Sequence, residues 1–122
     1  MRVKALVLID HGSRRAEANA LLEAMSARVA KLLPDWQVEP AHMELAEPTL
    51  AQAIARCVQN DAREIVVVPF FLGPGRHVTQ DIPRLLDDER AKYPEVSMRL
   101  TGALAPDDLL AQLVIQRATE DA

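Results

Sequence analysis

The chain has 122 residues, of which 49% are hydrophobic and 26% charged, and its formal net charge is -4 at pH 7. These values are typical of a globular protein with one core, and we expect a single domain over residues 1–122. Such an acidic chain is not expected to have nucleic acid or an anionic membrane as its main partner. It contains no apolar run near the ~20 residues that cross a bilayer, no signal-peptide pattern, and one cysteine, Cys57. We therefore expect a cytoplasmic protein in a reducing compartment.

The first strand and helix are indicated by a change in the hydrophobic pattern. Residues 3–9 are mostly aliphatic, which predicts a strand, and Asp10-His11-Gly12-Ser13 predicts a tight turn after it. Ser13 is expected to cap the helix that follows. The apolar side chains on one face of this helix are predicted to meet the core: Ala18, Leu21, Leu22, Met25, Val29, Leu32 and Leu33.

A second strand and helix follow the Pro34-Asp35 stop. Residues 36–45 alternate, and Pro40 among them favours an edge strand, because proline cannot donate to the hydrogen-bond ladder. Pro48 is expected in the first turn of the next helix. The predicted buried stripe of that helix is Leu50, Ile54, Cys57 and Val58.

The stretch from residue 65 to residue 82 is the most informative part of the chain. Residues 65–68 are an uninterrupted β-branched run, which predicts a strand buried on both faces of a parallel sheet. The loop after it contains Gly73 and Gly75, two of the four glycines, and leads to His77. We expect these glycines to supply a positive φ or a close approach of the backbone. The pattern thus predicts His77 at the carboxyl end of a central strand.

The rest of the chain repeats the alternation. Thr79 or Asp81 is expected to cap a third helix, residues 96–100 a fourth strand, and residues 106–119 a last amphipathic helix. The inward side chains expected are Leu85, Leu86 and Ala91 in the third helix, then Leu109, Leu110, Leu113 and Val114 in the last. Strands alternating with helices predict a small α/β protein: a four-stranded parallel sheet between helices in three layers.

Every glycine and every histidine is predicted at one edge of this sheet. His11 and Gly12 follow the first strand, His42 ends the second, and His77 follows the third. Ligands bind outside the carboxyl ends of the strands in open parallel sheets, so this edge is the expected site. Glu44 adds a carboxylate at the end of the second strand.

Two imidazoles and a carboxylate at one edge are compatible with three kinds of chemistry. They are suited to a divalent ion such as Co²⁺, Fe²⁺, Ni²⁺ or Zn²⁺, and to proton transfer near neutral pH. His11 could also be a phosphorylated nucleophile. Asp10 stands where phosphohistidine enzymes place an arginine, and a carboxylate repels a phosphoryl group, so we rank this reading lowest.

Three ordered motifs resemble the short form of the CbiX family, class II chelatases that insert cobalt, iron or nickel into sirohydrochlorin-type tetrapyrroles. The motifs are Leu8-Ile9-Asp10-His11-Gly12-Ser13-Arg14, then Glu44-Leu45-Ala46-Glu47-Pro48, then Pro69-Phe70-Phe71-Leu72-Gly73-Pro74-Gly75-Arg76-His77 with Asp81-Ile82-Pro83. The resemblance extends to about Gly102. After it, the chain reads Gly102-Ala103-Leu104-Ala105-Pro106 where the family more often has a histidine, and His42 stands where relatives are usually apolar.

The resemblance implies roles for particular residues. His11 and His77 would handle the metal and act in catalysis together with Glu44, which would accept protons or orient a histidine. It also implies a homodimer with no tightly bound cofactor. The expected substrates are sirohydrochlorin and a divalent ion, which we expect to be Co²⁺ before Fe²⁺ or Ni²⁺. The tetrapyrrole carries many carboxylates, which Arg14, Arg15, Arg76 and the helix start at Ser13 could receive, with Gly73 and Gly75 bordering the same surface.

The alternative to an enzyme is a non-catalytic carrier of metal or tetrapyrrole that uses the same face. For His42, an ordinary satisfied or exposed side chain on an edge strand is the favoured interpretation. Glu44 and the arginines, taken alone, would be ordinary surface charges.

Overall fold

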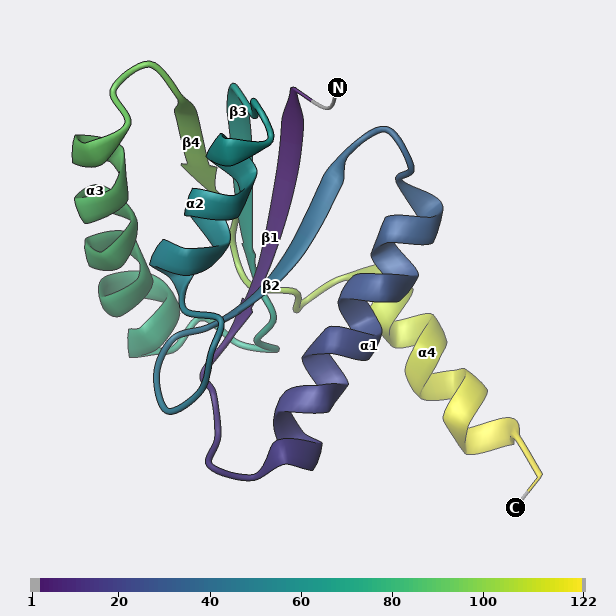
Figure 1. Cartoon of the computed structure of the whole chain (residues 1–122). Coiled ribbons are helices and arrows are strands. Elements are labelled where there is room, and N and C mark those ends of the chain that lie inside the picture. Colours follow the sequence, from purple (N-terminus) through teal and green to yellow (C-terminus); the bar gives the residue numbers. More distant parts are fainter. Residues whose placement is uncertain (1–2, 122) are drawn as a thin grey trace.

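The computed structural model describes residues 3–121, in which four parallel strands form one sheet (Figure 1). The strands are β1 (Lys4–Asp10), β2 (Gln37–His42), β3 (Glu64–Pro69) and β4 (Ser97–Leu100), and their order in space is β2-β1-β3-β4. All three pairings are parallel. The predicted four-stranded parallel sheet is therefore confirmed, as is the edge position of β2.

Helices cover both faces of the sheet. These are α1 (Ala16–Leu32), α2 (Leu50–Gln59), α3 (Ile82–Lys92) and α4 (Asp108–Thr119), and a π-helical turn, η1 (His77–Asp81), leads into α3. Figure 1 shows α2 and α3 side by side on one face and α1 on the other. No helix within residues 3–121 is long and apolar enough to span a membrane.

The main core lies between the sheet and the pair α2 and α3. Inward residues of β1 and β3 meet the predicted stripe of α2, in which Leu50, Ile54 and Cys57 are buried. Burial raises the pKa of the Cys57 thiol to about 12, so the thiol stays protonated as a small core group. Thr49 and Gln52 form a capping box at the start of α2. Pro48 therefore precedes the cap and does not lie in the first turn as predicted.

The start and the buried face of α1 differ from the prediction. The helix begins at Ala16 with Arg15 at the N-cap, so Ser13 does not cap it. Only Leu22 and Ser26 of this helix are buried, whereas Leu21 and Leu32 are 60% and 86% exposed. The reason is that α1 packs mainly on β1 and β2, and two strands cover only a narrow stripe of a helix.

The third helix begins one turn earlier than predicted, and in a different form. The backbone N–H of Ile82 donates to the carbonyl of His77, which closes a π turn over residues 77–81. Thr79 and Asp81 thus lie inside helical backbone and do not cap it. Leu86 is buried as expected, but Ala91 is exposed, and Glu89 takes the inward position instead.

The last helix forms where predicted, but its apolar side chains are not part of the core. No residue of α4 is buried, and Leu109, Val114 and Ile115 are 73%, 68% and 62% exposed. Figure 1 shows α4 extending from the body of the molecule on the side of α1. The prediction of an inward stripe is therefore wrong for the isolated chain.

Candidate functional site

The strand order creates a point where the chain direction in the sheet reverses. The chain moves from β1 outward to β2, then crosses back to β3 and on to β4, so the connections after β1 and β3 leave in opposite directions. Ligands bind at such switch points, at the carboxyl ends of the strands. His11 comes directly after β1, and His77 opens η1 after β3. Both predicted histidines therefore flank the switch point.

The two imidazole rings are in contact. Their centroids are 4.6 Å apart with an interplanar angle of 64°, an edge-to-face arrangement. The ring of Phe71 lies 6.3 Å from that of His77. Residues that are 66 positions apart in the sequence numbering (77 − 11) thus meet because β1 and β3 are neighbours.

His11 is held by its own loop and by the end of β2. Its Nδ1 lies 3.1 Å from the carbonyl of Gly12, which can only accept, so Nδ1 carries the hydrogen. Its Nε2 lies 3.0 Å from a carboxylate oxygen of Glu44. Two ligands bonded to one ion at right angles with bonds of ~2.1 Å are also ~3 Å apart. Nε2 and the Glu44 carboxylate are therefore spaced to share a metal ion or a proton.

Backbone pairing places Glu44 beside His11. The N–H of Met43 donates to the Asp10 carbonyl at 2.9 Å, and the N–H of Glu44 donates to the His11 carbonyl at 3.0 Å. Gly12 lies so close to this segment that an added Cβ would be 1.8 Å from the Glu44 carbonyl oxygen, and its φ is +92°. Only glycine fits a position with both constraints.

His77 is oriented by the carboxylate of Asp81, a residue that the sequence pattern predicts as a helix cap. Its Nδ1 lies 2.9 Å from Oδ2 of Asp81, one helical turn later. The i, i+4 spacing of a histidine and an aspartate was the sequence signal for this contact. Both side chains remain partly exposed, at 42% and 34%.

His11, His77 and Glu44 form an open set of possible donors. Within residues 3–121 no group of three His, Cys, Asp or Glu side chains is arranged to hold a metal ion. Two histidines and one adjacent carboxylate fall short of the closed tetrahedral set of a structural zinc site.

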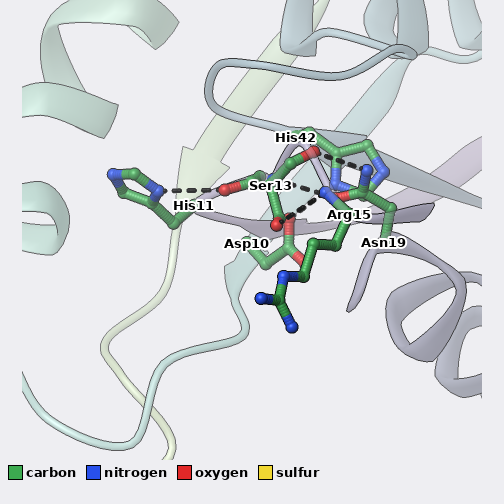
Figure 2. Close-up of polar contacts among 7 residues, drawn as sticks. Asp10, His11, Ser13, Arg15, Asn19 and His42 are labelled. Carbon is green, nitrogen blue, oxygen red and sulfur yellow. Dashed lines mark hydrogen bonds and ion pairs between the residues drawn. The ribbon is translucent and has the colours of Figure 1, made fainter. Parts of the chain in front are cut away.

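His42 lies on an edge strand, but its side chain is not accessible to solvent. It is fully buried, and its Nδ1 lies 2.6 Å from Oδ1 of Asp10, its partner across the β1–β2 pair. Figure 2 shows this pair together and the ring of His11 pointing away from it. His42 thus joins two strands.

The remaining predicted residues surround the site without touching its centre. Arg14 and Arg76 are exposed at the same edge, as is Arg15, and among the described residues none of the three guanidinium groups pairs with a carboxylate. Ser13 shapes the turn before α1: its hydroxyl accepts from the Arg15 N–H, and its backbone bonds Asn19 (Figure 2).

Gly73 and Gly75 do not have the special geometry expected of them. Neither has a positive φ, and a Cβ added to either meets nothing within 4 Å. Both are exposed, so the loop between β3 and η1 is open where the loop after β1 is tight.

The CbiX family model matches residues 5–121 of the chain. The chain belongs to the CbiX family. This CbiX domain is 44% identical over 112 residues to the chloroplastic sirohydrochlorin ferrochelatase of Arabidopsis thaliana, covering 92% of this chain and 50% of the relative. It is 32% identical over 123 residues to the sirohydrochlorin cobaltochelatase of Methanococcoides burtonii, covering 94% of each. The domain thus spans about half the length of the plant relative and nearly all of the archaeal one.

A solved structure with the same fold is SirB from Bacillus subtilis with Fe³⁺. The TM-score is 0.83 at 28% identity, and the match covers 96% of this chain but 46% of SirB. The CbiX domain therefore corresponds in size to one half of that protein.

Proposed function

We propose that this CbiX domain is a chelatase that inserts a divalent metal ion into sirohydrochlorin in tetrapyrrole biosynthesis. The observation that carries the proposal is the contact of His11 with His77 at the switch point, with Glu44 beside His11. The names of the relatives from Arabidopsis thaliana and Methanococcoides burtonii support the same reaction.

The reaction exchanges one metal ion for two protons. The ion leaves its protein donors and bonds four ring nitrogens, while the two pyrrole N–H groups release their protons. His11 and His77 present the ion through Nε2. As the ion leaves, Glu44 accepts one pyrrole proton, and the freed Nε2 of His11 or solvent water accepts the other. An open donor set holds the ion weakly enough for this transfer, and the metal is a substrate with no resident cofactor required.

Cobalt is the ion we propose first, with iron and nickel as the competitors to test. Imidazole and carboxylate ligands are permissive among these divalent ions. Support comes from relatives of both kinds, a cobaltochelatase and a ferrochelatase. The pathway served would be cobalamin synthesis for cobalt and sirohaem synthesis for iron.

The carboxylates of the tetrapyrrole are proposed to contact Arg14, Arg15 and Arg76. These are exposed cations at the histidine edge of a chain whose net charge is -4. Guanidinium groups bind carboxylates in a bidentate manner. The positive charge would draw an anionic substrate to this edge of an otherwise acidic protein.

A second copy of the chain is the partner we propose for α4. Leu109, Leu113 and Val114 are exposed along one side of this helix, and the domain corresponds to half of a longer relative of the same fold. In a homodimer, a second copy of the chain would cover that surface, in the place of the second half of the longer protein. Light scattering should give twice the monomer mass for the wild type and for Val3→Glu, and the monomer mass for Val114→Glu. A monomeric wild type would contradict the dimer.

The chelatase proposal is tested by the visible spectrum of sirohydrochlorin with Co²⁺ and a catalytic trace of protein. The same assay is run with Fe²⁺ under anaerobic conditions and with Ni²⁺. We expect many turnovers by the wild type and rates near the uncatalysed one for His11→Ala and His77→Ala. Conversion of a single macrocycle per site would instead favour a carrier, and variants as fast as the wild type would refute the assignment of the site.

We propose the cytoplasm as the compartment, which the single buried cysteine supports.

A further inference from the structure

We propose that Asp81 is the positioning residue of the site: its carboxylate fixes His77 as the Nδ1–H tautomer and so leaves Nε2 as the metal-binding nitrogen. This inference rests on the proposed function, because it assigns a task to His77 within that reaction. It adds to the site a residue that does not touch the metal and acts only through the histidine.

The hydrogen bond itself assigns the tautomer. Oδ2 of Asp81 lies 2.9 Å from Nδ1 of His77. An ionised carboxylate can only accept hydrogen bonds, so the shared hydrogen belongs to Nδ1, and the lone pair of the neutral ring is on Nε2. Metal-binding histidines commonly donate their other N–H to a carboxylate in this way, which orients the ring and increases its basicity.

The π turn explains why the carboxylate is in reach. His77 and Asp81 are the first and last residues of η1, and the turn is closed by the Ile82 N–H on the His77 carbonyl. Asp81 makes no capping bond to the backbone. Its hydrogen-bonding capacity is thus directed at the histidine and not at the start of α3.

The ring of His77 is also limited on its other sides. It contacts His11 edge to face at 4.6 Å between centroids, and Phe71 lies 6.3 Å away. In both histidines Nδ1 donates a hydrogen bond, but the acceptors are of different kinds. The Nδ1 of His11 is held by a backbone carbonyl, whereas that of His77 is held by a side chain that can be changed.

The test compares Asp81→Asn with Asp81→Leu. The amide oxygen of asparagine can still accept the Nδ1–H, whereas leucine keeps a similar size and offers no acceptor. The control is the same leucine substitution at Asp87, whose carboxylate is 70% exposed and pairs with Arg90 on the far part of α3. Circular dichroism establishes that each variant folds, and Asp81→Ala replaces the leucine variant if that one does not.

The first readout is the tautomer of His77 in metal-free protein, from long-range ¹H–¹⁵N correlation spectra at a pH where the ring is neutral. We expect Nδ1–H in the wild type, Asp81→Asn and Asp87→Leu, and a mixture or Nε2–H in Asp81→Leu. A wild type with hydrogen on Nε2, or a leucine variant with an unchanged tautomer, would overturn the proposal. This readout needs no substrate, so it stands even if the chelatase proposal fails.

The second readout is the rate of Co²⁺ insertion. Loss of such a carboxylate typically lowers metal affinity or activity ~10–100-fold. We therefore expect the insertion rate to fall by that factor in Asp81→Leu, by at most about threefold in Asp81→Asn, and not at all in Asp87→Leu. An asparagine variant as slow as the leucine variant would mean that the charge of Asp81 acts directly on the metal, which contradicts a positioning role. A leucine variant at the wild-type rate would contradict it as well.

Discussion

The two loops that supply the histidines are built in opposite ways. The loop after β1 is bonded to the end of β2 through Met43 and Glu44, and it passes so close to that segment that only Gly12 fits. The loop after β3 is bonded to its surroundings at Phe71 and Leu72, whose carbonyls accept the N–H groups of Leu104 and Ala105. A Cβ added to either of its glycines would meet nothing within 4 Å. The candidate site thus has a tight side, where the loop holds His11 beside Glu44, and an open side, where the glycines have no close neighbours.

The substitution expected to disrupt the tight loop after β1 most is Gly12→Ala. The added Cβ meets the Glu44 carbonyl, and the positive φ alone costs ~1–3 kcal/mol. We expect a lower melting temperature and a loss of metal insertion of about 100-fold, since a displacement of ~1 Å in a catalytic group costs about that much.

The matched change on the open side is Gly75→Ala. Its Cβ meets nothing within 4 Å, and the backbone there has no positive φ. We expect the free energy of unfolding to stay the same or rise by ~0.4–1 kcal/mol, because alanine reduces the entropy of the unfolded chain. The measurement is thermal denaturation of Gly12→Ala and Gly75→Ala. Equal destabilisation of the two variants would show that the two loops are equally constrained.

A smaller effect is expected from Glu44→Gln, which keeps the tight loop and removes its charge. The amide can neither take a proton nor form an ion pair, so we expect kcat to fall ~100-fold, the low end for a lost proton acceptor, with little change in melting temperature. Glu47→Gln is the control, because the Glu47 carboxylate bonds Gln52 at the start of α2. If the two variants have the same kcat, Glu44 has no part in proton transfer.

The smallest effects are expected from the exposed arginines on the two sides. Arg14→Gln changes the tight side and Arg76→Gln the open side, and each removes one cation from the edge of the sheet that carries the histidines. We expect each to raise the KM for sirohydrochlorin several-fold with kcat nearly unchanged, because a surface-exposed charge pair contributes ~0.2–1 kcal/mol. The increase should shrink as salt is added. A fall in kcat without a change in KM would place the arginine in the chemical step.

The sequence predicts what depends on pattern and topology. Alternating strands and helices gave the parallel sheet, Pro40 gave the edge strand, and the histidines at one edge gave the contact of His11 with His77. These follow from rules on where parallel strands end, and they do not require knowledge of side-chain packing.

The remaining features depend on packing that one sequence does not reveal. The spacing of Leu109 and Leu113 on α4 was typical of a core-facing helix, but the chain covers neither. A pattern shows that a face is apolar, and not whether its partner is this chain or another. For His42 the pattern predicts a satisfied or exposed side chain, and it does not reveal the partner, because the pairing with Asp10 depends on the register of β1 and β2.

The central claim is that His11 and His77 act as one site. The most direct test is the rate of Co²⁺ insertion by His11→Ala, His77→Ala and the double variant, all confirmed as folded. If the two rings handle one ion, the double variant should be about as slow as the slower single variant, because either change already disables the shared site. If the two losses multiply, or if either single variant keeps the wild-type rate, the histidines work independently and the account is wrong.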